Sequence, residues 1–337
     1  MTTFEIIDSH VHLYPPEINR APAAWAAARG EPHWALLCTR ARKNGRPVQT
    51  FPDPATLLRA MDAAGVTRAI LQGWYWETPE SCALQNAFYA ECIRLHPDRL
   101  AACAAIHPRA GAAGVRDEIH RAADTGFAGL GELSPHSQNI NADDPALHAA
   151  FALAGELNLA VNLHVTESGE AGGAASGTAS GDVDAAAKGG AGGGAGGSAS
   201  VAGAKNYPGK IATPLADFVA WAQAHPRTRF VLAHWGARLP LDAGHAAASR
   251  AAKNIFYDTA ASPLTYGANS AAIWREMTAA AGAGRILFGT DFPLVLYPKI
   301  ETTPSISSLA DEARASGLDA RDLAAIFSEN ARRVYAR

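Results

Sequence analysis

The chain opens with the stretch FEIIDSHVH (residues 4–12), a short apolar run that leads directly into two histidines. Successive side chains of a β-strand point to opposite faces, so His10 and His12 point to the same side, together with Asp8. Two imidazoles on one face can bind one cation. Two exposed loop histidines would give the same pattern, so this stretch alone predicts a strand and leaves the metal site open.

Seven more short apolar runs follow, separated by segments of helical periodicity. Such alternation is typical of repeated βα units around a parallel sheet. Eight units predict an α/β fold of the (β/α)₈ TIM barrel type. An open doubly wound sheet is the alternative, but a Gly-rich phosphate loop is missing after the first strand. The expected strands are 4–8, 67–72, 100–106, 128–132, 159–164, 229–234, 254–258 and 285–289.

The expected helices lie between these runs and carry recognisable start signals. Asp53, Asp144 and Thr213 each precede a proline, which places a capping side chain before Pro at the first helical position. The sequence predicts helices over 54–64, 81–95, 114–123, 145–157, 214–224, 271–281, 305–315 and 319–328.

Length and composition bound the domain organisation. The chain has 337 residues, which suits one barrel domain over 1–337. Residues 169–204 break the pattern, since 29 of these 36 residues are Gly, Ala or Ser. Such a segment buries too little apolar surface to offset its ordering entropy. We expect a flexible insertion after the fifth strand, and a mobile lid is the alternative.

Charge and cysteine usage exclude several classes of partner. The chain carries 29 Lys and Arg against 32 Asp and Glu, for a net charge of −3, which argues against nucleic acid. The sequence contains no stretch of about 18 apolar residues, so it predicts no membrane span. The four cysteines show no C-x-x-C spacing, which favours a reducing cytoplasmic setting. We expect a small-molecule substrate, and exposed barrel helices are compatible with a homodimer.

Four later strand runs also end in a side chain that can bind metal. These side chains are Glu132, His164, His234 and Asp291. Barrel active sites are built at the carboxyl ends of the strands, where these groups would meet His10 and His12. Any one of them could instead form an ion pair or a buried hydrogen bond. Six such groups at one mouth would need a cation to balance them, so the set predicts a metal site.

Candidate substrate contacts follow other strands. Aromatic side chains after the second strand could line a pocket or pack a lid, and the arginines could bind a substrate carboxylate or form ordinary ion pairs. The histidines after the third and fourth strands are candidates for the surroundings of the pocket. The candidates are Trp74, Trp76, His107, Arg109, His136, Arg238 and Tyr14.

The HxH after the first strand, His164, the run LAHWGA around His234 and the run GTDFP around Asp291 together resemble the amidohydrolase superfamily. Within it they are similar to the amidohydrolase-related group that includes the aminocarboxymuconate semialdehyde decarboxylase type. The resemblance implies a barrel of the metal-dependent hydrolase type. It also implies that His10, His12, His164 and Asp291 bind a divalent metal, with His234 beside the metal-bound water.

Glu132 departs from the mononuclear pattern. It resembles the bridging carboxylate ligand of two-metal relatives such as the TatD-type deoxyribonucleases, which leaves one or two ions open. Imidazoles and carboxylates suit Zn²⁺ best, and they also fit Mn²⁺, Fe²⁺, Co²⁺ and Ni²⁺.

The ligand types predict a metal-dependent hydrolase that cleaves a C–N or C–O bond of an amide, lactone or ester. A bound cation makes hydroxide available at neutral pH, with Asp291 as the proton shuttle and His234 orienting the water or stabilising an oxyanion. The alternative is a metal-dependent non-oxidative decarboxylase of an unsaturated or aromatic acid. A phosphoester hydrolase and a metal-binding barrel without catalytic activity are further readings.

Overall fold

The computed structural model describes residues 4–42, 44–165, 213–267 and 270–336, so the expected insertion at 169–204 lies outside the described residues. Eight parallel strands form one sheet in sequence order, and each of the eight expected runs contains or overlaps one of them. The strands are β1 (Ile6–Val11), β2 (Val66–Leu71), β3 (Leu100–Ala104), β4 (Gly129–Leu133), β5 (Ala160–Leu163), β6 (Phe230–Leu232), β7 (Ile255–Asp258) and β8 (Ile286–Leu287).

Backbone hydrogen bonds between β1 and the residues at and beyond the end of β8 bring the two edges of the sheet together. The N–H of Ser9 donates to the carbonyl of Phe288 at 2.8 Å, and the N–H of Asp291 donates to the carbonyl of His10 at 2.9 Å. The eight parallel strands therefore form a nearly closed barrel, and the predicted (β/α)₈ fold is confirmed.

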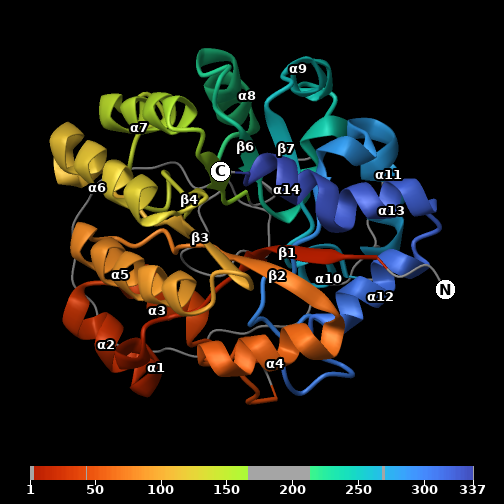
Figure 1. Ribbon diagram of the computed structural model, residues 1–337, viewed down its shortest axis with the longest axis horizontal. Coiled ribbons are helices and arrows are strands. Elements are labelled where there is room, and N and C mark those ends of the chain that lie inside the picture. The colour runs from red at the N-terminus through yellow and green to blue at the C-terminus, as the bar shows by residue number, and fades with distance from the viewer. Residues whose placement is uncertain (1–3, 43, 166–212, 268–269, 337) are drawn as a thin grey trace.

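Helices surround the sheet, as Figure 1 shows. The expected helices are present, several with ends shifted by one to three residues, and the described residues also contain short helices that the sequence did not predict. The helices are α1 (Pro16–Arg20), α2 (Pro22–Arg29), α3 (Pro32–Cys38), α4 (Pro54–Ala64), α5 (Pro79–Leu95), α6 (Gly111–Thr125), α7 (Pro145–Glu156), α8 (Leu215–Ala224), α9 (Ala246–Ala251), α10 (Ser262–Tyr266), α11 (Ser270–Ala281), α12 (Ser307–Ala315), α13 (Ala320–Ala324) and α14 (Asn330–Val334).

Two of the three predicted helix caps are confirmed. Asp53 accepts a hydrogen bond from the N–H of Thr56, and Asp144 accepts from the N–H groups of Ala146 and Leu147. The third prediction is wrong, because α8 begins one residue later than expected and places Pro214, rather than Thr213, at the cap position.

The predicted helix over 319–328 is present from Ala320 and changes from α- to π-helical geometry at Ala325. A wider turn over Ala325–Glu329 separates α13 from α14, and the carbonyl of Ile326 accepts from the N–H of Phe288 at 2.9 Å. A carbonyl that accepts a hydrogen bond from the barrel is less available for the regular α-helical bond, which accounts for the wider turn.

The last helix, α14, covers one end of the barrel and lies in front of the strands in Figure 1. Val334 and Tyr335 join a buried apolar cluster with residues near the starts of several strands, such as Ile7 and Ala160. The amino end of the barrel is therefore sealed by apolar packing, which leaves the carboxyl end for the site.

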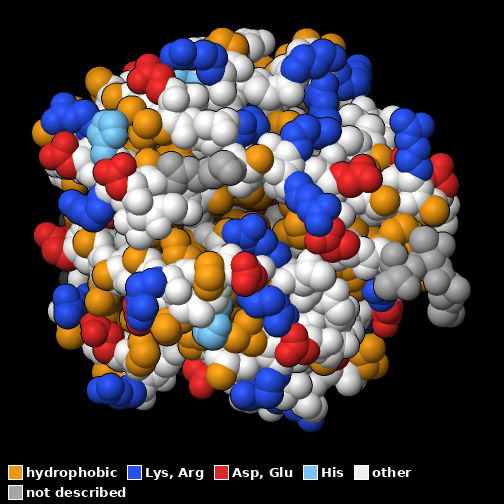
Figure 2. Space-filling model, in the orientation of Figure 1, with side chains coloured by type: hydrophobic (Ala, Val, Ile, Leu, Met, Phe, Trp, Pro, Cys, Tyr) orange, Lys and Arg blue, Asp and Glu red, His pale blue; other side chains and the backbone are white. Residues whose placement is uncertain are grey.

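Figure 2 shows the same face with its side chains. Basic and acidic side chains are interspersed over it, without one area of a single sign. Among the described helices, none has the length and apolar character to cross a membrane.

Candidate metal centre

All six predicted groups meet at the carboxyl end of the barrel. His10 lies on β1 and His12 follows it, while Glu132 lies on β4. His164 directly follows β5, and His234 and Asp291 lie shortly beyond β6 and β8. Strand ends that are far apart in the sequence therefore converge, as a parallel barrel requires.

The six groups form two neighbouring clusters. His10, His12 and Asp291 make the first, and Glu132, His164 and His234 make the second. Within each cluster the candidate ligand atoms all lie within 4.8 Å of one another. Each cluster therefore has the number and type of side chains that can hold a divalent ion.

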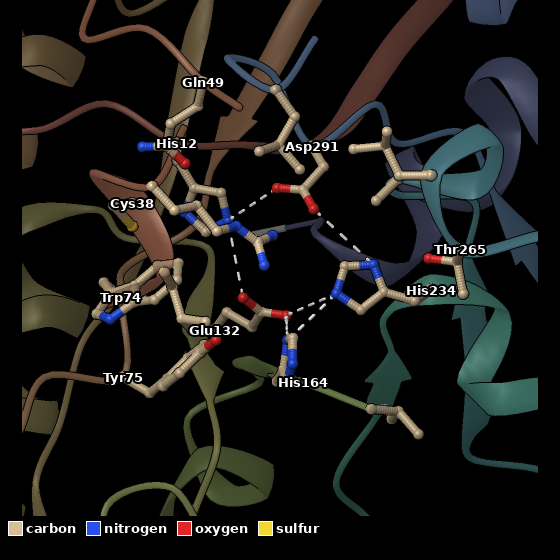
Figure 3. Close-up of a pocket in the computed structure, with 16 residues that line it drawn as sticks. His12, Cys38, Gln49, Trp74, Tyr75, Glu132, His164, His234, Thr265 and Asp291 are labelled. Atoms are coloured by element: carbon tan, nitrogen blue, oxygen red, sulfur yellow. Dashed lines mark hydrogen bonds and ion pairs between the residues drawn. The ribbon is translucent and has the colours of Figure 1, made fainter. Parts of the chain in front are cut away.

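Glu132 belongs to the second cluster and lies between its two imidazoles and His12 of the first (Figure 3). Its Oε2 atom is 3.7 Å from His12 Nε2 and 3.8 Å from His10 Nε2. Its Oε1 atom is 2.8 Å from His164 Nδ1 and 3.6 Å from His234 Nε2. One carboxylate thus faces both sets of imidazoles, which is the placement that a bridging ligand needs.

Acceptors outside the clusters fix the orientation of three imidazole rings. The Nδ1 atoms of His10, His12 and His234 lie 2.9–3.0 Å from oxygens of Asp258, Gln72 and Ala260. A carboxylate or carbonyl oxygen only accepts, so each Nδ1 carries the proton. The Nε2 lone pairs of these rings are then directed toward the cluster, where His10 Nε2 and His12 Nε2 lie 3.1 Å apart. Nitrogen lone pairs that converge in this way fit a cation.

Burial and charge set the protonation of the centre. Burial lowers the pKa of His10, but the negative charges of Asp258 and Glu132 outweigh it and raise this pKa to about 10. Burial and the neighbouring charge of His10 lower the pKa of His12. Burial alone would raise the pKa of Glu132, but the imidazoles of His164 and His10 hold it well below its usual range. Positive charge is therefore stabilised at the point where the carboxylates meet, which is the condition for binding a cation.

The backbone at two of these positions is left-handed. His234 has a φ of 56° and Asp291 a φ of 65°, values that L-residues rarely adopt. The turn continues through Gly236, where an added Cβ would lie 2.7 Å from Cδ1 of Tyr257. Only glycine fits there, so the run HWG after β6 is needed to aim His234 into the barrel.

A cavity of about 280 Å³ opens above the clusters, and five of the six groups line it. Trp74 and Tyr75 form one wall and stack on each other, with ring centroids 4.2 Å apart. Tyr75 also lies against His164, with ring centroids 5.0 Å apart. The cavity is therefore bounded by flat aromatic surface on the side of His164.

The end of α3 and the loop between α3 and α4 line the cavity with side chains that the sequence did not single out, namely Cys38 from the helix and Arg40 and Gln49 from the loop. The loop is held in place by backbone pairing between Gln49 and Leu294 and by a bond from the N–H of Val295 to the carbonyl of Val48 at 3.0 Å. Neither the spacing nor the composition of this loop marks it as part of a site.

Most of the predicted substrate contacts lie elsewhere. Trp74 lines the cavity, but Tyr14 and Trp76 are buried in an aromatic cluster with Trp34. Trp76 Nε1 donates to Oε1 of Gln85, and the hydroxyl oxygen of Tyr14 lies 3.7 Å from Sγ of Cys38.

The remaining four candidates are engaged with other groups. His107 Nδ1 accepts from the N–H of Arg109, whose guanidinium reaches the carbonyl of Gln138 at 3.4 Å. His136 pairs with Asp217 at 3.0 Å, and Arg238 lies over the ring of Tyr266 at 5.6 Å. None of the four is among the described residues that line the cavity.

An eight-stranded parallel barrel with imidazoles and carboxylates at the carboxyl ends of its strands defines a class of metal-dependent barrel enzymes. The amidohydrolase family model matches residues 7–337, so this chain belongs to the amidohydrolase family and is a metal-dependent enzyme. Among curated proteins, none gives a significant match.

Several solved structures share the fold over nearly the whole chain. The 5-carboxyvanillate decarboxylase of Sphingomonas paucimobilis has a TM-score of 0.66 at 16% identity and covers 99% of both chains. The 5-carboxyvanillate decarboxylase of Novosphingobium aromaticivorans, complexed with manganese and 4-hydroxy-3-methoxy-5-nitrobenzoic acid, has a TM-score of 0.62 at 16% identity and covers 98% of this chain and 96% of its own. A probable 2-pyrone-4,6-dicarboxylic acid hydrolase of Acinetobacter baumannii has a TM-score of 0.61 at 12% identity and covers 99% and 100%. At these identities the likeness shows the fold.

Proposed function

We propose that this protein is a metal-dependent non-oxidative decarboxylase of a small unsaturated or aromatic carboxylic acid. The observation that carries the proposal is Arg40, which lines the same cavity as the candidate ligands and the stacked rings of Trp74 and Tyr75. Among the described residues that line the cavity, Arg40 supplies the one Lys or Arg side chain. A guanidinium binds a carboxylate, and flat rings favour a planar substrate.

The similar structures also favour decarboxylation over hydrolysis. Two of the three similar structures described above are decarboxylases of an aromatic acid. The sequence favoured hydrolysis, and the comparisons support the decarboxylase alternative better. We therefore place decarboxylation first.

In this proposal His10, His12, His164 and Asp291 hold the divalent ion, with Glu132 as a further carboxylate ligand. When bound, the ion polarises a substrate oxygen and supplies an acidic water. The sequence favoured Zn²⁺, but nothing in the comparisons supports zinc. One relative is complexed with manganese, so we propose Mn²⁺ as the ion to test first.

The side chains of the cavity then have separate tasks. Arg40 binds the substrate carboxylate, and Trp74 and Tyr75 pack against the planar part and exclude water. When the bond to the carboxyl carbon breaks, CO₂ leaves and the bonding electron pair stays on the substrate, which must take up one proton. Its source is His234, whose pKa is raised because the hydrogen bond that it donates to Glu132 and the charge of Asp291 outweigh the effect of burial.

A hydrolase is the second candidate, and one observation favours it. Glu132 faces the imidazoles of both clusters and would be placed to hold two ions, which would supply an activated water for the hydrolysis of a lactone or amide. The 2-pyrone hydrolase among the similar structures is in line with this reading.

The test is to incubate the Mn²⁺-loaded protein with aromatic and unsaturated acids, and in parallel with lactones and amides, and to identify products by mass spectrometry. Decarboxylation gives a product lighter by CO₂, whereas hydrolysis adds one water. Consumption of lactones or amides with no loss of CO₂ from any acid would reject the proposal.

The Arg40→Met variant tests the carboxylate contact. We expect kcat/KM to fall roughly a hundredfold, because a charged partner of the substrate is lost. Arg42→Met is the matched control, since Arg42 lies in the same loop but donates to the carbonyl of Val295. Equal effects of the two substitutions would show that Arg40 only supports the loop.

A further inference from the structure

Asp258, the last residue of β7, lies beneath the metal centre and is fully buried. It belongs to neither cluster of candidate ligands. Asp258 ends the expected strand 254–258, and the sequence pattern predicts no role for it. Its position raises the question of what a fully buried carboxylate does there, since burying a charge is costly unless it is paired.

Both carboxylate oxygens of Asp258 are occupied. Oδ2 accepts from His10 Nδ1 at 2.9 Å and from the side-chain amide of Asn162 at 3.1 Å. Oδ1 accepts from the N–H groups of His234 and Ala260, both at 3.1 Å. Four donors take up its lone pairs, which makes Asp258 a hydrogen-bond acceptor and not a metal ligand.

Through Oδ2, Asp258 fixes the ring of His10. Because the carboxylate only accepts, His10 Nδ1 keeps its proton whether or not Nε2 is protonated, and Nε2 is the nitrogen that faces His12 and Glu132. A metal ion needs a ring nitrogen without a proton, and the partner of the other nitrogen decides which one can lose its proton. Asp258 therefore decides which nitrogen of His10 faces the centre.

Through Oδ1, Asp258 fixes the backbone of His234 in its left-handed conformation. The carbonyl of His234 accepts from the Tyr266 hydroxyl at 2.9 Å, and the Nδ1 atom of His234 lies 3.0 Å from the carbonyl of Ala260. A backbone in this rare region persists only where its surroundings hold it. One carboxylate thus supports two imidazoles, one from each cluster.

We propose that Asp258 is a positioning residue that sets the tautomer of His10 and the backbone of His234 and so sets the metal affinity of the centre. The inference rests on the metal site of the proposed function and not on the reaction. Its tests therefore use no substrate, and they remain informative if decarboxylation is disproved.

The decisive variant is Asp258→Asn, which has the same shape. The two backbone N–H groups cannot change, so the amide oxygen must face them and the NH₂ group turns to His10. Nδ1 then has to accept, and its proton moves to Nε2, which is the nitrogen directed at the metal. We expect Mn²⁺ affinity to fall roughly ten- to hundredfold, as for other residues that orient a ligand histidine.

Asp8→Asn is the matched control. Asp8 is also fully buried, but it accepts from the Thr290 hydroxyl and from backbone N–H groups of His10 and Thr290, not from a ring. A hydroxyl can turn to accept from an amide, so this substitution leaves the tautomer of His10 unchanged.

Two measurements decide the question. Long-range ¹H–¹⁵N spectra of the metal-free protein with labelled histidine report which ring nitrogens carry protons, and titration followed by the EPR signal of free Mn²⁺ gives the affinity. We expect a proton on His10 Nδ1 in the wild type and in Asp8→Asn, and its loss in Asp258→Asn together with the weaker Mn²⁺ binding.

The proposal is overturned if Asp258→Asn keeps the proton on His10 Nδ1, or if its Mn²⁺ affinity equals that of the wild type. Should Asp258→Asn fail to fold, the wild-type spectrum alone remains decisive. An unprotonated His10 Nδ1 in the wild type contradicts the assignment.

Discussion

The two ends of the barrel are formed by the same eight strands but carry opposite kinds of side chain. The amino end is filled with apolar groups and covered by α14, with Val334 fully buried there. The carboxyl end holds six imidazoles and carboxylates close together, with left-handed backbone at His234 and Asp291. Buried polar groups and rare backbone conformations reduce stability unless neighbouring groups compensate them, and they cluster at functional sites. The contrast indicates that one end stabilises the fold and the other carries the chemistry.

The largest effect should come from removing two imidazoles at the carboxyl end. The double variant His10→Ala/His12→Ala should lose metal binding, because two of the three groups of the first cluster are gone. The measurement is metal content per chain by elemental mass spectrometry. The matched control is His148→Ala/His225→Ala, a pair 2.9 Å apart that lies between α7 and α8. Full occupancy in the first variant would disprove the site.

The next largest effect concerns turnover rather than binding. Asp291→Asn should lower kcat by roughly a thousandfold while the fold is kept, because a ligand and proton carrier loses its charge. Turnover of the substrate found in the screen, with circular dichroism as the check on folding, measures this. Asp217→Asn, which alters the pair with His136 outside the cavity, should have little effect. Comparable losses in both variants would remove the special role of Asp291.

The sequence was sufficient to predict the fold and the strand-end side chains, but not the loop residues of the cavity or the residue that supports the centre. Hydrophobic runs and the chemical type of the strand-end residues were sufficient to predict the barrel and the six groups, because parallel strands bring their carboxyl ends together. Arg40 and Gln49 were missed because a loop has no periodicity that shows where it folds back. Asp258 was missed for another reason. A carboxylate at a strand end looks the same in sequence whether it binds a metal or a neighbouring ring.

A smaller effect is expected at the amino end, on stability alone. Val334→Ala removes buried methyl groups beneath the barrel and should lower the free energy of unfolding by about 2 kcal/mol without changing Mn²⁺ affinity. Chemical denaturation measures the first quantity and metal titration the second. Val165→Ala is the counterpart, since Val165 is equally buried but lines the cavity. Altered metal binding in Val334→Ala would show that the two ends are coupled.

The smallest effect should come from a polar side chain outside the metal centre, which we expect to contribute to stability and not to function. Asp53 caps α4 through a 2.8 Å hydrogen bond from the N–H of Thr56, and hydrogen bonding by the side chain of Thr56 together with this backbone bond lowers the pKa of Asp53. Asp53→Ala should reduce the free energy of unfolding by about 1 kcal/mol and leave metal affinity and turnover unchanged. Because the pKa is lowered in the folded state, this stabilisation is present at neutral pH and is lost as the pH falls through that pKa. Asp53→Asn, which can still accept the bond, is the control, and denaturation at neutral and acidic pH is the measurement. A loss of activity in Asp53→Ala would mean that the function extends beyond the ring of strand ends into the helices around it.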